Sequence, residues 1–306
     1  MPTHRKQQEK VLPKILVIVG PTAGGKSDLA VLLAKDLNGE IISADSRQVY
    51  RGLDIGSGKI TKKEMQKIPH HLLDVSSPKR SFSVAQYKTQ ANRAIKGIIS
   101  RGKVPIICGG TGFYIQAVVD GLMLPEVKAD KALRKKLSKM SSGELCALIA
   151  KKDPFRAEHI DAKNKVRLIR ALEIIMSLGK VPPLTKELLY EPLFLGLEVP
   201  QPKLRERIHI RLHKRMQQGM LKEVVRLHEE GVSYKRMEAL GLEYRFLARF
   251  LQKKLTKKEM LNNLETAIVQ YAKRQYTWFR RDKRVHWLAF TDTRVAITLA
   301  KNFLSS

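Results

Sequence analysis

Apolar residues in the first 120 positions form short continuous runs, which alternate with longer segments whose apolar residues recur every three or four positions. The short runs predict buried β-strands at 14–19, 40–44, 70–75 and 103–108. The longer segments predict helices at 26–37 and 83–100. This alternation is typical of an α/β fold in which helices cover both faces of a parallel sheet. Ligands of such sheets bind beside the carboxyl ends of the strands.

The pattern changes to helical and basic between residues 128 and 190, and a strand pattern returns at 193–199. We therefore expect three parts: residues 1–127 as the first part of an α/β core, 128–190 as an inserted helical domain, and 191–306 as the part that completes the core with long basic helices. Ser141 with Glu144, and Thr256 with Glu259, have the spacing of helix-capping boxes. A last strand is expected at 285–290.

The charge balance indicates a polyanionic partner. The chain of 306 residues has 58 Lys and Arg against 29 Asp and Glu, a formal net charge of +29, which favours nucleic acid. The alternative is that many of these side chains are simply solvated. Two cysteines exclude a disulfide framework or a four-cysteine zinc site. Residues 1–14 contain no apolar segment of a signal peptide, and no run approaches membrane-spanning length, so we expect a cytoplasmic protein without a membrane partner.

A phosphate-binding loop follows the first predicted strand and precedes the first predicted helix. Its residues are Gly20, Pro21, Thr22, Ala23, Gly24, Gly25, Lys26 and Ser27. The glycines let backbone N–H groups converge on an anion, and the helix adds the positive end of its dipole. The lysine can reach terminal phosphate oxygens, and the serine hydroxyl can ligate Mg²⁺. The sequence thus predicts a polyphosphate site with Mg²⁺ as cofactor, of the kind that most often binds ATP.

An aspartate follows the second predicted strand. Nucleoside triphosphatases usually place a metal-binding aspartate at a strand end, but the strand at 103–108 is followed by "GGTGFY". Asp45 instead follows the strand at 40–44, where a metal ligand or a general base can lie near the loop. The alternative for Asp45 is a simple turn residue.

Six motifs occur in order along residues 14–285: "GPTAGGKS", "SADSRQVYRGLDIG", "PHHLLD", "CGGTGFYIQA", "RLIRALEI" and "YAKRQYTWFRR". Together they closely resemble the tRNA dimethylallyltransferase family, also called tRNA isopentenyltransferase. The resemblance implies transfer of a dimethylallyl group from dimethylallyl diphosphate to N6 of adenosine 37 in tRNA, with release of diphosphate. The loop would then bind the donor's diphosphate. Because no zinc finger follows the last motif, the chain resembles the bacterial type.

The resemblance also implies roles for individual residues. Asp45 would accept the proton of the adenine amine, while Lys26, the loop and Mg²⁺ held through Ser27 would stabilise the departing diphosphate. Thr111 would lie near both substrates, although the sequence equally allows a helix N-cap. The tRNA-binding positions implied are Asp45, Ser46, Arg47, Gln48 and Thr111 in the core, with Arg134, Val166, Arg167, Leu168, Ile169 and Arg170 in the insertion. Arg167 and Arg170 share a helix face that suits RNA phosphates, though such a pair is more often solvated.

In the last motif, we expect Tyr271, Trp278 and Phe279 to pack inward and Arg274 to point towards diphosphate or RNA. His70 and His71 are interpreted as hydrogen-bonding residues, because no third metal ligand lies at useful spacing. The expected partners are the tRNA anticodon stem-loop and dimethylallyl diphosphate, bound by a monomer. Three alternatives stay open: an isopentenyltransferase acting on free adenosine phosphates, a P-loop kinase, and a non-catalytic RNA-binding protein.

Overall fold

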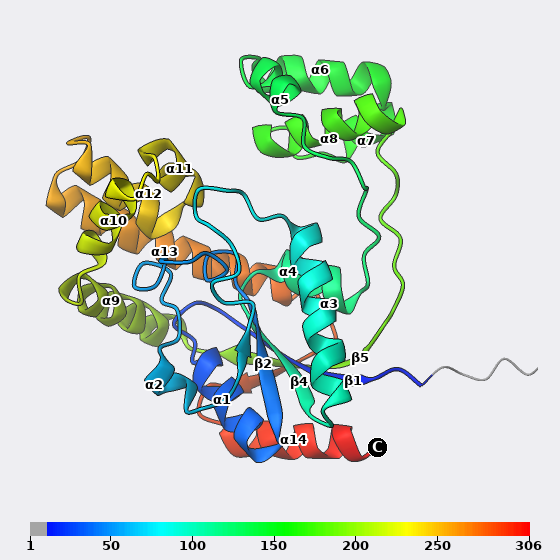
Figure 1. The fold of residues 1–306 in the computed structure, drawn as a ribbon, viewed down its shortest axis with the longest axis vertical. Coiled ribbons are helices and arrows are strands. Elements are labelled where there is room, and N and C mark those ends of the chain that lie inside the picture. The colour runs from blue at the N-terminus through cyan, green and yellow to red at the C-terminus, as the bar shows by residue number, and fades with distance from the viewer. Residues whose placement is uncertain (1–10) are drawn as a thin grey trace, which may run out of the picture. The chain divides into compact units, whose positions relative to one another are not determined.

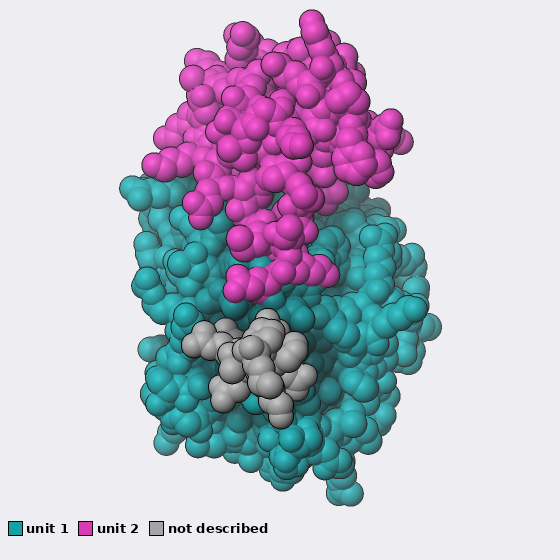
Figure 2. Space-filling model, turned by 90° about the vertical axis from the view of Figure 1, so that its right-hand side faces the viewer, with its two compact units in different colours: residues 1–121, 188–306 teal, residues 122–187 magenta. Residues whose placement is uncertain are grey.

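The computed structural model describes residues 11–306 and divides the chain into two compact units. One unit, the core unit, consists of residues 11–121 and 188–306, and the other, the helical unit, of residues 122–187 (Figures 1 and 2). Most of residues 1–14, where the sequence has no apolar segment of a signal peptide, lie outside the described residues. The helical unit begins at residue 122 and ends at residue 187, whereas the sequence predicts an insertion from 128 to 190. The unit includes the segments that lead into and out of its helices, and these segments pair with each other. Leu122 forms a β-bridge with Lys186, and the Met123 N–H donates to the Thr185 carbonyl (2.9 Å).

A six-stranded parallel sheet forms the centre of the core unit, with strand order β3-β2-β4-β1-β5-β6. The strands are β1 (Lys14–Val19), β2 (Gly39–Ala44), β3 (His70–His71), β4 (Val104–Gly109), β5 (Glu191–Glu198) and β6 (Val285–Ala289). β3 is much shorter than the run 70–75 predicts. Leu72 and Asp74 adopt positive φ angles of 64° and 58°, which end the extended conformation.

Helices cover both faces of this sheet, as predicted. α1 (Lys26–Asp36) and α14 (Thr293–Ser305) pack on one face, where Leu33 and Ala300 are fully buried against β1, β4 and β5. α3 (Val84–Ser100) and α4 (Gly112–Val119) pack on the opposite face (Figure 1). The predicted α/β class is therefore confirmed, and the carboxyl ends of β1, β2 and β4 lie together at one edge.

A second layer of helices completes the core unit. Its members are α9 (Gln201–Gln217), α10 (Met220–Glu229), α11 (Tyr234–Leu240), α12 (Leu242–Leu251) and α13 (Lys257–Phe279). The short α2 (Lys62–Met65) does not belong to this layer; it lies between β2 and β3 in the chain and has no buried residue. Apolar side chains of α9 to α13 form one cluster with Val49 and Leu53 from the segment after β2. α13 begins at the predicted capping box of Thr256 and Glu259, and its last residue, Phe279, is buried in the sheet cluster. One helix thus belongs to both apolar clusters.

The helical unit contains α5 (Lys131–Leu137), α6 (Ser142–Lys152), α7 (Pro154–Glu158) and α8 (Lys165–Leu178). Leu145, Ile149 and Leu172 are fully buried in a core of its own. α6 begins at the predicted capping box of Ser141 and Glu144. In the described part of the chain, no helix is both long enough and apolar enough to cross a bilayer.

Candidate active site

The phosphate-binding loop connects the end of β1 with the start of α1. Gly20 has φ 139°, and a Cβ there would lie 3.0 Å from the Leu197 carbonyl oxygen, so both conformation and space require glycine. Gly25 is the N-cap of α1 with φ 95°, and the Gly24 N–H donates to the Pro21 carbonyl (3.1 Å). The amino-terminal end of α1 consequently faces the loop, where its dipole favours an anion.

This loop lines a cavity of about 440 Å³ at the carboxyl ends of the strands. Several segments of the core unit line it. They contribute Thr22 to Asp28 in and after the loop, Asp45 and Gln48 after β2, Ser57, Gly58, Ile60 and Glu64 before and in α2, Gly109 and Gly110 at the end of β4, and Arg207, Arg211, Lys214, Tyr271 and Gln275 from α9 and α13. The structure therefore brings the predicted loop residues and Asp45 to one site. A site that combines a phosphate loop with a carboxylate can hold an anion and accept a proton from a neighbouring group.

Lys26 is the loop cation, and its Nζ donates to the Pro21 carbonyl (2.6 Å). Burial lowers the pKa of Lys26 from 10.5 to about 8; Cys108 and Asp45 oppose this shift, and the Arg211 charge adds to it. Without a bound anion, this ammonium group is in an unfavourable environment. A phosphate ligand would supply the missing negative charge and favour the protonated form.

Asp45 closes the turn that follows β2. Its Oδ1 accepts hydrogen bonds from the backbone N–H groups of Arg47 (2.7 Å) and Gln48 (3.3 Å). The turn role that the sequence left open is therefore real, and Asp45 also lines the cavity. Both turn hydrogen bonds use the same carboxylate oxygen, which fixes the orientation of the group.

Thr111 occupies the N-cap position of α4, but its side chain makes no capping hydrogen bond. Its Oγ1 instead accepts from the Ser46 N–H (3.0 Å). The hydroxyl thereby joins the segment after β4 to the turn that holds Asp45. A capping role for the hydroxyl, which the sequence allowed, is not what this structure contains.

Gln275 on α13 is a site residue that the sequence analysis missed. Its side chain is 5% exposed; Oε1 accepts from the Thr22 N–H (2.7 Å) and Nε2 donates to the Gly110 carbonyl (3.1 Å). One amide group therefore joins the phosphate loop to the segment after β4. The signal in the sequence is a polar residue on the same helix face as Ala272 and Phe279, both of which are buried.

The basic face of α9 was also missed. Arg207, Arg211 and Lys214 lie at helical spacing and line the cavity together. Arg211 Nη2 donates to the Gly58 carbonyl (3.1 Å), which holds the guanidinium in place. With Lys26, these cations give the cavity a strong preference for anions. The signal was the recurrence of basic residues every three or four positions within a helix already expected to be basic.

Two of the three aromatic residues in the carboxyl-terminal part of α13 pack inward as expected, and the third does not. Tyr271 lines the cavity and Phe279 is buried, whereas Trp278 is 37% exposed. Arg274 is exposed, and its guanidinium lies over the Tyr271 ring, 5.8 Å from the centroid. Its side chain is not among those that line the cavity, whereas the Tyr271 ring beneath it is.

The predicted tRNA-binding residues of the helical unit fall into three groups. Arg134 and Arg170 bind the buried Glu173 at 2.7 and 3.3 Å, so part of their hydrogen-bonding capacity is used within the unit. Val166 and Arg167 are exposed at the start of α8. Leu168 is fully buried and Ile169 is half-buried, because both belong to the core side of the same helix. The Leu168 and Ile169 side chains pack in the apolar core of the helical unit, so the exposed surface at the start of α8 consists of Val166 and Arg167.

The histidines of the "PHHLLD" motif have structural partners. His70 Nδ1 lies 2.8 Å from the Ile68 carbonyl and His71 Nε2 lies 2.7 Å from Glu40 Oε2. Glu40 also binds Arg101 (2.7 Å). Hydrogen bonding, the interpretation favoured from sequence, is what the structure contains.

A family model described as IPP transferase matches residues 48–282 of the chain. The tRNA dimethylallyltransferase of Anoxybacillus flavithermus is 42% identical over 288 residues, which cover 92% of either chain. The tRNA dimethylallyltransferase 2 of Citrifermentans bemidjiense is 44% identical over 279 residues, which cover 91% of this chain and 90% of the relative.

Solved structures give the same result. The tRNA isopentenylpyrophosphate transferase of Bacillus halodurans is 37% identical with a TM-score of 0.72, and the match covers 95% of both chains. A eukaryotic dimethylallyltransferase acting on tRNA is 27% identical with a TM-score of 0.84, and the match covers 96% of this chain and 80% of that one. On the family model and these relatives, the chain belongs to the IPP transferase family, as its six motifs predict.

Proposed function

We propose that this enzyme transfers the dimethylallyl group of dimethylallyl diphosphate to N6 of adenosine 37 in tRNA and releases diphosphate. The observation that carries the proposal is that the phosphate loop and Asp45 line one cavity. The aspartate that a nucleoside triphosphatase uses for its metal was expected after β4, but that strand is followed by Gly110 and Thr111. Asp45 follows β2 instead, where it can accept a proton from an acceptor amine that reacts beside a polyphosphate. Membership of a transferase family supports the same reaction class.

On the donor side, the diphosphate would bind to the loop N–H groups at the start of α1 and to Lys26. Arg207 and Arg211 line the same cavity and would add two further positive charges. As the bond between the allylic carbon and the diphosphate oxygen breaks, negative charge accumulates on the leaving group. Fixed cations at this place stabilise the transition state more than the ground state.

The oxygen donors available to a magnesium ion are consistent with the expected cofactor. Ser27, Asp28 and Asp45 all line the cavity, and hard divalent cations prefer oxygen ligands of these types. Ser27 is the residue that we propose as its protein ligand, with diphosphate oxygens completing the shell. When bound, the ion would add positive charge against the departing diphosphate.

On the acceptor side, Asp45 would orient the N6 amine and accept its proton as the nitrogen bonds to the allylic carbon. The amine is a weak nucleophile because its lone pair is delocalised into the purine. The Arg47 and Gln48 N–H groups hold Asp45 through Oδ1, and the Thr111 hydroxyl holds Ser46 beside it. The base has to leave the stack of the anticodon loop to reach this carboxylate, at a cost of about a few kcal/mol.

Binding of the remaining tRNA is assigned to exposed basic residues. Arg167 at the exposed start of α8 is the residue of the helical unit that we propose for phosphate contact. The net charge of +29 supports an association that is strong and dependent on salt. Arg134 and Arg170 would contribute as a pair already positioned by Glu173.

The test is to incubate the protein with Mg²⁺, dimethylallyl diphosphate and tRNA that lacks N6 modifications, and to analyse the nucleosides by mass spectrometry. A five-carbon adduct on adenosine 37 is expected. Parallel reactions with AMP in place of tRNA, and with ATP in place of the isoprenoid, separate the alternatives. Transfer to AMP but not to tRNA, or consumption of ATP without any adduct, contradicts the proposal.

A further inference from the structure

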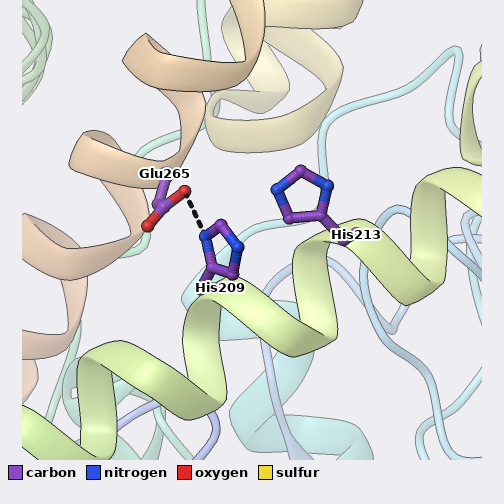
Figure 3. A group of neighbouring side chains, drawn as sticks. All are labelled: His209, His213 and Glu265. Carbon is purple, nitrogen blue, oxygen red and sulfur yellow. Dashed lines mark hydrogen bonds and ion pairs between the residues drawn. The ribbon is translucent and has the colours of Figure 1, made fainter.

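Three side chains on two helices of the core unit form a compact cluster outside the cavity lining (Figure 3). His209 and His213 lie one turn apart on α9, and Glu265 faces them from α13. Their potential ligand atoms all lie within 4.8 Å of one another. Within residues 11–306, no other group of three or more His, Cys, Asp or Glu side chains meets this condition.

The contacts inside the cluster show how its members are held. His209 Nδ1 lies 3.0 Å from Glu265 Oε2, and the rings of His209 and His213 are 4.3 Å apart between centroids. Both histidines are exposed and Glu265 is half-buried. Helical spacing of four positions places both imidazoles on one face, so the arrangement follows from the sequence of α9 once α13 is beside it.

We propose that His209, His213 and Glu265 bind one divalent transition-metal ion of the zinc type, with the remaining position open to water. Two imidazoles and a carboxylate are donors that Zn²⁺ accepts in four-coordinate sites. Magnesium and calcium require oxygen ligands, so the two imidazoles select against them. The cluster would therefore take a different metal from the one expected at Ser27.

The geometry requires only small side-chain movements. A tetrahedral ion with bonds of about 2.0–2.2 Å holds its ligand atoms roughly 3.4 Å apart. The present separations, up to 4.8 Å, are close to this value, and exposed side chains can rotate to reach it. The ion would take the place of the hydrogen bond between His209 Nδ1 and Glu265 Oε2, with the imidazole proton on Nε2, because a coordinating ring nitrogen carries no proton.

A metal ion bound at this cluster would join α9 to α13. α9 carries Arg207 and Arg211 into the cavity, and α13 carries Tyr271 and Gln275 into it. An ion held by both helices would link the two elements that present these side chains. Because the ligands come together only in the folded chain, the bound ion should stabilise the fold by an amount that grows with its concentration above Kd.

The test uses the full-length, tag-free, metal-stripped protein in excess Mg²⁺, which occupies oxygen-rich sites. Co²⁺ is titrated as a spectroscopic substitute for zinc, and its visible absorption is followed. We expect one equivalent of Co²⁺ to bind with the spectrum of a four-coordinate ion and to be displaced by Zn²⁺. Zn²⁺ should also raise the melting temperature of the protein.

Two ligand variants and one control decide whether the cluster is the site. His213→Gln and Glu265→Gln should weaken Co²⁺ binding at least tenfold and abolish the rise in melting temperature. His286→Gln removes an exposed histidine on β6 and should change neither measurement. His213 is exposed, so its replacement leaves the fold intact. Absence of saturable binding, equal affinity in His213→Gln, or an equal loss in His286→Gln would overturn the proposal.

Discussion

The lowered pKa of Lys26 predicts a pH dependence of donor capture. Burial brings this pKa from 10.5 to about 8, and only the protonated form attracts diphosphate. Raising the pH from 7 to 9 therefore reduces the charged fraction of free Lys26 from about 90% to about 10%. Since kcat/KM reports ionisations of the free enzyme, kcat/KM for dimethylallyl diphosphate should fall about tenfold over this range.

The assay measures initial rates of adduct formation at saturating tRNA and Mg²⁺, with the donor varied below its KM. Lys26→Arg is the matched control, because a guanidinium stays charged throughout this range. That variant should be slower overall, yet its kcat/KM should not change between pH 7 and 9. A flat profile in the natural enzyme, or the same fall in Lys26→Arg, would refute the assignment of the titration to Lys26.

Three further substitutions test other parts of the site. Asp45→Asn keeps the oxygen that closes the turn but removes the base, so turnover should fall by about 10²–10⁴ with an unchanged melting temperature; a loss below tenfold argues against the base. Gln275→Leu leaves the Thr22 N–H and the Gly110 carbonyl without their partner, and urea unfolding should show a loss of about 2–4 kcal/mol. Arg167→Ala should raise KM for tRNA and make the plot of log Kd against log salt shallower by about 0.7–0.9; an unchanged slope contradicts phosphate contact.

Local patterns were sufficient to predict the six strands in their order along the chain, together with α1 and α3, but not the order of the strands within the sheet. An apolar run that ends at Gly20 and a helix that starts at Lys26 define the phosphate loop without any tertiary information. The strand at β3 was predicted too long, since the apolar pattern continues through Leu72 while its backbone turns into a left-handed conformation. The pattern of apolar residues indicates which side chains are buried, but it does not indicate the backbone φ angle that ends a strand.

The parts of the site that the sequence did not predict depend on contacts across long stretches of chain. Gln275 binds a backbone group of Thr22, and nothing near either residue indicates the other. The same holds for Arg211, whose partner is the Gly58 carbonyl. Predicting such residues requires the packing of α9 and α13 around the loop, which only the folded structure supplies.

The pairing of Leu122 with Lys186, and of Met123 with Thr185, joins the two points at which the chain enters and leaves the helical unit. Contacts within the helical unit therefore hold its two ends together. These contacts, rather than the pairing of β4 and β5 with β1, offset the entropic cost of bringing the ends together. A module with adjacent ends can be lengthened, shortened or exchanged while β4 and β5 keep their registers with β1. Substitutions on the exposed surface of the helical unit can therefore accumulate independently of the chemistry at Asp45.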